Sequence, residues 1–593
     1  MRHRVRFRLG DGINVLKGNY GGRLRGPQDS QQILSITMRC LAGMSLLTIC
    51  ALFVPRDQFF WITLKLLVQQ DIWLLELFFL LSILIFVLPC QNVSIISFRF
   101  KHVVLISIAI IAFCYLGHRL VLMGYDLSRD EQMANFDASI FARGRLVWPL
   151  PQGWQSEASA LNLEFMLPVS QPVAWVSAYL PMNAVLRAVV GTLGDSALTG
   201  PLLTAGSLLL MLSIAKCIWP TDTETPTITL LILLGSGQLV ITGMTAYAMP
   251  AHLFFNLLWL RLFMADRPAC DGAAVFTGFV ATGLHQPLFH PMFIAPFLFL
   301  LFIEKRWARL LSFMIGYGAV CLFWLLWPLL IHSLMTGPNS ITAAGGTDYL
   351  SRLLQALSFN MGSLTLTAAN LLRFCAWQHL FLLPLLATGF LAAKKDRFAG
   401  AVAVSFILPI IVMAVILPWQ GIGFGYRYLH GVLGNAALLA GYGWRYLNPS
   451  HEQLRPLFLK ATVASLVILL PVQGWMAHAR YQPFASASQK IDKSGADYAI
   501  IEAKDGPLMM DSVINRADLS NRPIRLAYEN IRNVDMLAQR ICKPGVNVAL
   551  ATDAFYAPLW AYFNLKPEHR GSPSLTAAKN PFERAGCDVQ LIS

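Results

Sequence analysis

The chain has 593 residues, of which 56% are hydrophobic and only 13% are charged, and its mean hydropathy is +0.55. A soluble globular protein carries roughly 25% charged residues, so this composition excludes a single aqueous core and favours a polytopic membrane protein. The net charge of +14 does not indicate a nucleic-acid partner, because the basic residues lie mostly in short runs between apolar segments. Such runs are typical of topology signals and of contacts with anionic lipids.

Residues 1–33 form a basic arm without the apolar stretch and cleavage site of a signal peptide, so we expect a retained cytoplasmic arm. Residues 34–476 should form a helical transmembrane domain, because about thirteen of its segments are long enough to cross a bilayer, some only marginally. These segments are 34–54, 72–90, 102–121, 197–217, 226–244, 248–264, 272–287, 288–303, 309–332, 377–393, 398–417, 427–446 and 458–476.

The distribution of basic residues predicts the orientation of these segments. If the arm is cytoplasmic, the later cytoplasmic connections, such as 304–309 and 394–397, all carry Lys or Arg, as the positive-inside rule requires. The opposite side then receives the long loops 122–196 and 333–376. We therefore expect an integral membrane protein, in a bacterium an inner-membrane protein, whose loop 122–196 faces the periplasm.

The loop 122–196 holds four carboxylates within about three helical turns, in a chain that is otherwise poor in acid. They are Asp126, Asp130, Glu131 and Asp137. The spacing over 131–145 predicts a helix whose apolar face lies in the membrane interface, and a second short apolar helix should run to Val190. Acids clustered at the mouth of a span indicate either chemistry at the bilayer surface or a solvated group of loop charges.

Several basic and aromatic residues are candidates for binding a phosphate at the exoplasmic face. Arg427, within 423–428, stands at the expected start of a span, and its planar guanidinium suits phosphate. It could equally be an interfacial anchor beside Tyr426 and Tyr428. Arg373 is a weaker candidate of the same kind. His285 is either part of the site or a hydrogen-bonded core histidine.

Residues 477–593 contain no span and are long enough for a domain. Segments 498–502 and 546–551 predict short strands, so we expect a small exoplasmic α/β domain. Its only cysteines, Cys542 and Cys587, would lie in an oxidising compartment. The sequence is compatible with a disulfide between them and with two buried free thiols.

The order of these features resembles the GT-C superfamily of membrane glycosyltransferases over roughly residues 100–480. The features are the acidic loop after a span, the short helix ending at 191–195, and the segment Tyr426-Arg-Tyr428 before an exoplasmic C-terminal domain. The resemblance implies a polyprenyl-phosphate-linked sugar as donor and a glycan, lipid or protein as acceptor. It matches Asp130 and Glu131 to the family's catalytic acid pair. Three spans precede the loop where the family usually has one, and no second acidic motif follows, so a divalent cation such as Mg²⁺ or Mn²⁺ stays open.

Transfer of a sugar to a hydroxyl needs one base, because a phosphate leaves without a proton from a second acid. We therefore expect inversion, with Asp130 as the base, Glu131 orienting it or holding a metal, and Arg427 binding the donor phosphate. The other expected substrate-binding residues are Tyr426, Asp126, His285 and Arg373. A polysaccharide polymerase or O-antigen-type ligase would use the same donors but would depend on Arg and His. A transporter or flippase is disfavoured, because carriers need polar sites at mid-membrane and the central segments contain almost no Asp or Glu.

Overall fold

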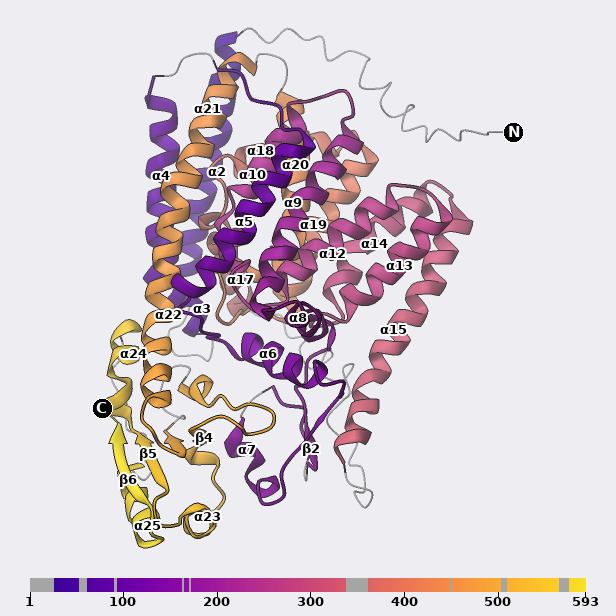
Figure 1. Cartoon of the computed structure of the whole chain (residues 1–593). Helices are drawn as coiled ribbons and strands as arrows, with labels where there is room; N and C mark the ends of the chain where they lie inside the picture. Colours follow the sequence, from indigo (N-terminus) through magenta and orange to yellow (C-terminus); the bar gives the residue numbers. More distant parts are fainter. Residues whose placement is uncertain are drawn as a thin grey trace.

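The structure is a computed structural model that describes residues 26–52, 61–89, 93–162, 165–169, 172–336, 361–447, 451–502, 509–564 and 575–592. Most of the basic arm, and residues 337–360 of the loop 333–376, lie outside the described residues. The described part is a bundle of helices with a small sheet at one end, next to the acidic loop (Figure 1).

Three helical segments precede the acidic loop, as the sequence predicts. They are α2 (Gly26–Leu52), the run α3 (Trp61–Leu66), η1 (Leu67–Asp71) and α4 (Ile72–Val87), and α5 (Phe100–Leu120). The loop itself contains α6 (Arg129–Phe141), α7 (Ala158–Leu161), α8 (Met182–Thr192) and the antiparallel pair β1 (Trp148–Pro149) and β2 (Ala174–Trp175).

The remaining helices of the bundle follow in chain order. They are α9 (Thr199–Ile218), α10 (Thr225–Leu234), α11 (Gly237–Thr242), α12 (Met249–Phe263), α13 (Pro268–Thr282), α14 (Phe289–Ile303), α15 (Trp307–Met335), α17 (Met361–Ala376), α18 (Leu382–Ala393), α19 (Arg397–Ile416), η4 (Arg427–Val432), α20 (Leu433–Leu447), α21 (His451–Ala464), η5 (Ser465–Leu469) and α22 (Leu470–Asp492). The expected span 226–244 is broken, because Gly235 ends α10 and Ser236 caps α11.

Among the described residues, six helices are long and apolar enough to cross a membrane. They are Ile62–Val87, Phe100–Leu120, Ser196–Ile218, Trp307–Met335, Arg397–Ile416 and Leu454–Asp492. Four shorter apolar helices accompany them, at Ile33–Ile49, Thr225–Leu234, Phe289–Ile303 and Leu382–Ala393. These helices make the chain an integral membrane protein, while the number of thirteen spans stays a prediction.

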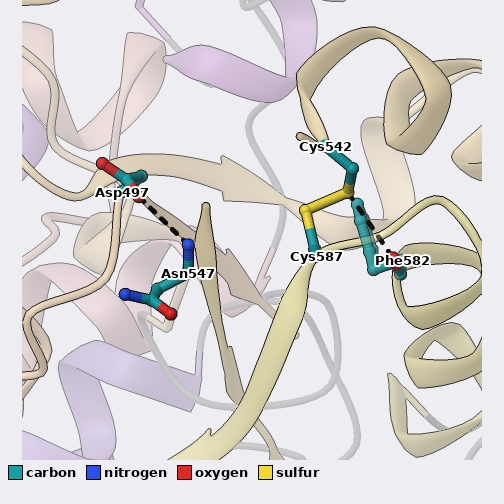
Figure 2. The surroundings of a disulfide bond; sticks show 5 residues. All are labelled: Asp497, Cys542, Asn547, Phe582 and Cys587. Carbon is teal, nitrogen blue, oxygen red and sulfur yellow. Dashed lines mark hydrogen bonds between the residues drawn. A yellow bond between two sulfur atoms is a disulfide. The ribbon is translucent and has the colours of Figure 1, made fainter. Parts of the chain in front are cut away.

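The C-terminal region contains a four-stranded parallel sheet in the order β4-β3-β5-β6. The strands are β3 (Tyr498–Ile501), β4 (Ile524–Ala527), β5 (Asn547–Ala551) and β6 (Asp588–Ile592), and helices α23 (Val534–Ile541), α24 (Ala557–Tyr562) and α25 (Lys579–Arg584) connect them. Cys542 and Cys587 form a disulfide at the amino end of the parallel strands β5 and β6. Asp497 lies at the same end, just before β3, and accepts a hydrogen bond from the Asn547 N–H at 3.0 Å (Figure 2). The sequence left a disulfide and two free thiols as alternatives, and the structure contains the disulfide.

Two features join the sheet to the bundle. The last membrane helix continues past residue 476, where we expect the span to end, and α22 reaches Asp492 just before the sheet (Figure 1). The apolar face of α6 does not lie in the membrane interface, which corrects that expectation. Met133, Phe136 and Ile140 are buried in one core with Trp175 and with apolar residues of the C-terminal region. That core holds the acidic loop against the sheet.

Candidate functional site

The acidic loop is positioned by a capped helix. Ser128 precedes α6, and its Oγ accepts a hydrogen bond from the Glu131 N–H at 3.4 Å, while the Ser128 N–H donates to Glu131 Oε2 at 3.2 Å. This reciprocal pair is a capping box, which stabilises the start of a helix. Gly124, at φ +63°, supplies the left-handed turn that leads from α5 to this cap. The cap fixes where α6 begins and therefore the direction of the Asp130 side chain.

Asp130 lies against two partners from distant parts of the chain. Its Oδ1 accepts a hydrogen bond from the Tyr179 hydroxyl, and its Oδ2 accepts one from Arg427 Nη1 at 2.6 Å. The side chains of Asp130 and Arg427 are only 9% and 13% exposed. Burial alone would raise the pKa of the Asp130 carboxyl, but the positive charge of Arg427 and the hydrogen bonds from both partners hold this pKa below its ordinary value. Asp130 is therefore ionised at neutral pH.

The segment that carries Tyr179 is fastened to the same face of α6. Asp137 accepts hydrogen bonds from the backbone N–H of Ser177, at 3.0 Å, and from its hydroxyl. Burial raises the pKa of Asp137 to about 7. Beyond this anchor, the rings of Tyr179 and His285 stack with their centroids 4.3 Å apart. Tyr179 is thus held between α6 and the turn from α13 to α14.

The loop before Arg427 is closed by a glutamine and a glycine. Gln420 donates through Nε2 to the carbonyl of Gly425 at 2.8 Å, and its Oε1 accepts from the Arg427 N–H at 2.8 Å. Gly425 has φ +63°, and a Cβ on it would lie 2.4 Å from Oε1 of Gln238. Only glycine fits there without displacing that side chain. This tight loop sets the position from which Arg427 reaches Asp130.

Arg427 also faces a small cavity on the bundle side of the ion pair. The cavity measures about 30 Å³ and is lined in part by His252, Asn256, His285 and Tyr428, which leaves room for a water molecule or two. The guanidinium carbon lies 5.3 Å from the centroid of the Tyr428 ring. Arg427 Nε and both ring nitrogens of His252 are buried without a hydrogen-bond partner among the described residues. Donors and acceptors for a further ligand therefore surround the ion pair.

Glu131 has a different environment from Asp130, although the two are adjacent in sequence. Its side chain is fully buried, and Oε2 accepts a hydrogen bond from the Tyr481 hydroxyl of α22 at 3.1 Å as well as from Ser128. Burial, with a contribution from the negative charge of Asp126, raises the pKa of Glu131 to about 8. Glu131 is therefore protonated at neutral pH, and its contacts are those of a residue that positions α6.

Arg373, expected to bind substrate, is fully buried in another ion pair. Its Nε donates to Asp71 Oδ2 at 2.6 Å, and its Nη2 donates to the carbonyl of Gly423 at 2.9 Å. Arg480 of α22 donates to the same carbonyl at 3.0 Å. Arg373 thus lies behind the loop that carries Arg427 and makes no hydrogen bond with Asp130.

The other two expected residues also lie apart from the ion pair. Tyr426 is fully buried, with its ring edge-on to that of Tyr428 at 5.8 Å between centroids. Asp126 faces another direction, and its Oδ2 accepts a hydrogen bond from Asn135, which in turn accepts one from Arg187 Nε at 2.8 Å. Of the seven expected site residues, the structure brings together Asp130, Arg427 and His285.

A divalent cation such as Mg²⁺ needs several converging oxygen ligands. Asp130 engages Arg427 and Tyr179, whereas Glu131 engages Ser128 and Tyr481, so the two carboxylates do not converge. Within the described ranges, no group of three or more His, Cys, Asp or Glu side chains is placed to hold a metal ion. The residues present do not fit a metal held jointly by Asp130 and Glu131.

Sequence reasoning missed Tyr179, His252 and Asn256. His252 and Asn256 carry a readable signal, because they stand four residues apart on one face of an apolar helix, where polar side chains usually have a function. Tyr179 offers no such signal, since one tyrosine in a loop near a membrane is ordinarily an interfacial residue.

No protein-family model matches the chain, and no curated protein matches it. Solved structures do. The crystal structure of ArnT from Cupriavidus metallidurans bound to undecaprenyl phosphate is 13% identical with a TM-score of 0.43, over 81% of this chain and 89% of that chain. The same enzyme in the apo state is 11% identical with a TM-score of 0.42, over 70% of this chain and 84% of that chain. Because both TM-scores lie below 0.5, the function proposed below rests on the residues of the site.

Proposed function

We propose that the chain is a membrane glycosyltransferase of the GT-C type that moves a sugar from a polyprenyl-phosphate donor to a hydroxyl of an acceptor at the exoplasmic face. One observation carries the proposal. A buried carboxylate and a buried guanidinium, Asp130 and Arg427, meet at 2.6 Å where the apolar bundle joins the acidic loop. A sugar-phosphate donor with a lipid tail needs this combination of a base, a cation for phosphate and an adjoining apolar bundle.

In the proposed reaction the acceptor oxygen attacks the anomeric carbon while the bond from that carbon to the phosphate oxygen breaks. The hydroxyl proton passes to Asp130, and the electron pair of the broken bond leaves with the phosphate. Arg427, whose Nε has no partner among the described residues, would hold the phosphate by hydrogen bonds to its charged oxygens. One displacement of this kind inverts the anomeric configuration.

The electrostatics of the site support Asp130 rather than Glu131 as the base. Asp130 stays ionised because Arg427 lowers its pKa, whereas Glu131, with a pKa of about 8, is protonated at neutral pH. A charged carboxylate also stabilises the positive charge that develops at the anomeric carbon in an oxocarbenium-like transition state. The cavity beside Arg427 is too narrow for a sugar, so donor binding requires the surrounding side chains to move.

Replacing Asp130 by asparagine tests the proposal, because asparagine keeps the shape and the acceptor for Tyr179 but removes the charge. Turnover should fall about 10²–10⁴-fold, the usual contribution of a general base. A deletion strain that lacks the protein should accumulate the unused polyprenyl-phosphate sugar, which mass spectrometry of its membrane lipids identifies. The same strain carrying the Asp130→Asn protein should accumulate the same lipid. The purified protein is then assayed with that lipid.

Asp195→Asn is a matched control. Asp195 forms an ion pair with Arg119 at 2.6 Å near the end of α8, and its side chain is 30% exposed. This variant also removes one negative charge, but Asp195 makes no contact with Asp130. The Asp195→Asn protein should therefore consume the donor as the wild type does. A well-expressed Asp130→Asn protein with wild-type turnover would remove Asp130 from the mechanism.

A further inference from the structure

A second and larger cavity lies on another side of α6 from the Asp130–Arg427 pair. It measures about 550 Å³ and is enclosed by residues 124–126, by α6, by the end of α22 and by residues 514–525 of the C-terminal region. This volume is in the range of small-molecule sites. Asp130 and Arg427 do not line it, whereas Gln132, Met133 and Phe136 do. The cavity is therefore separate from the proposed reaction centre.

Its wall contains buried polar atoms that lack partners. The Tyr125 hydroxyl, Asp126 Oδ1 and Asn162 Nδ2 are buried and make no hydrogen bond with any residue that the structure describes. Tyr125 is 8% exposed and Asn162 is 4% exposed. Buried polar groups in folded proteins nearly always have a partner. These three residues line the cavity, and a small rotation of their side chains would bring a hydroxyl, a carboxylate oxygen and an amide N–H to its surface as donors and acceptors for a ligand rich in hydroxyl groups.

The charge of the wall favours an anionic ligand. Four arginines and two aspartates line the cavity, an excess of two positive charges. Arg129 and Arg525 are buried and paired, with Asp511 at 3.3 Å and with Asp492 at 2.7 Å respectively. The other two, Arg516 and Arg522, are exposed and form no ion pair with any described residue. They are placed to bind a carboxylate or a phosphate from the solvent side.

We propose that this cavity binds an acidic stretch of carbohydrate, with sugar hydroxyls on Tyr125, Asp126 and Asn162 and a carboxylate or phosphate on Arg516 and Arg522. If the chain is the glycosyltransferase proposed above, on which this inference rests, the ligand is the non-reacting part of the sugar acceptor. Helix α6, about 10–12 Å across with its side chains, separates this cavity from Asp130. The site therefore determines which acceptor binds and takes no part in the bond-forming step.

Titration calorimetry with the purified full chain in detergent tests the site without donor. The probes are tetragalacturonate, which carries carboxylates, pentamannosyl phosphate, which carries a phosphate, and neutral maltotetraose. At least one acidic probe should bind tenfold or more tightly than maltotetraose, and which one binds identifies the acid. Arg516→Gln combined with Arg522→Gln should weaken that probe tenfold or more. Lys493→Gln combined with Lys543→Gln, which removes two exposed charges outside the cavity, should not.

Asp130→Asn distinguishes this proposal from that of the transferase. It should retain binding of the acidic probe, because Asp130 does not line the cavity. Normal turnover in Asp130→Asn, together with probe binding that is lost in the Arg516/Arg522 variant, would overturn the mechanism and leave the carbohydrate site in place. Equal binding of all three probes by the wild type, or undiminished binding in the Arg516/Arg522 variant, would overturn the site.

Discussion

The Arg427→Gln variant should bind the lipid donor more weakly than the wild type does. In the wild type the guanidinium is 13% exposed and donates to Asp130 at 2.6 Å, with Nε left for a phosphate oxygen. A hydrogen bond to a charged group contributes about 1.5–3 kcal/mol. Since 1.36 kcal/mol corresponds to a factor of ten, the dissociation constant for the donor should rise roughly 10- to 150-fold.

The same change should move the acid limb of the activity profile to higher pH. With Arg427 present, the pKa of Asp130 is lower in the folded protein than in the unfolded chain, where it is about 3.9. The ionised carboxylate therefore stabilises the fold at any pH above about 3.9. This contribution is lost only as the pH falls through the pKa of the folded protein. Without Arg427 the burial of Asp130 dominates, so its pKa rises and the sign reverses. The variant should then lose stability as the pH rises, by at most about 3–5 kcal/mol, the cost of breaking a fully buried pair.

Three measurements on purified protein in lipid nanodiscs check this reasoning: polyprenyl-phosphate binding, initial rates of transfer between pH 5 and 8, and thermal unfolding over the same range. Arg119→Gln, which breaks the exposed pair with Asp195, should leave all three unchanged. Arg427→Lys should keep the acid limb near the wild-type position but lose part of the affinity, because an ammonium lacks the planar fork of a guanidinium. Wild-type affinity and an unshifted acid limb in Arg427→Gln would refute the assignment of Arg427.

Three other predictions concern the helix cap, the orientation and the disulfide. Glu131→Gln keeps the capping box and removes a titrating carboxyl. The pKa of this carboxyl is about 8 in the folded protein and about 4.3 in the unfolded chain, so the stability of the wild type falls as the pH rises from about 4.3 to 8. Its melting temperature should therefore vary less with pH than that of the wild type, and an equal dependence would contradict this. In a background without the free cysteines, an impermeant thiol reagent should label Ser520→Cys in intact cells but Lys394→Cys only after lysis, and the opposite pattern would invert the topology. Replacing Cys542 and Cys587 by serine should reduce the free energy of unfolding by about 3–4 kcal/mol, because the bond joins residues 45 apart. A Cys217→Ser control should be neutral, and equal melting of both variants would show that the bond contributes nothing.

Local patterns in the sequence predict the elements around the site well. The helix in the acidic loop, the strands at 498 and 547 and the three helices before the loop all follow from apolar periodicity and turn residues. The capping box Ser128-Arg-Asp-Glu131 is also local, and it separates the two acids. Consecutive residues of a helix point about 100° apart, so Asp130 and Glu131 cannot be treated as one pair.

The partners of these residues could not be predicted in the same way. Asp130 meets Tyr179 and Arg427, which are 49 and 297 residues away, and Arg373 meets Asp71 across 302 residues. No periodicity encodes such distances, because they depend on how the helices pack. The burial of the apolar face of α6 could not be predicted for the same reason. Apolar spacing alone does not distinguish a face that packs against Trp175 and the C-terminal core from a face that lies in lipid.

The buried arginine at the start of α6 has a consequence for the order in which this protein matures. Arg129 is 2% exposed, and its guanidinium is satisfied by the carbonyls of Met510 and Val513 and by Asp511. These partners are made more than 380 residues later, which at 5–20 residues per second is roughly 20–80 s of synthesis. During that interval the loop with the proposed base has no place to bury this charge. The reaction centre can therefore be completed only after residues 510–513 have been made, so that a product ended before them would reach the membrane without a working site.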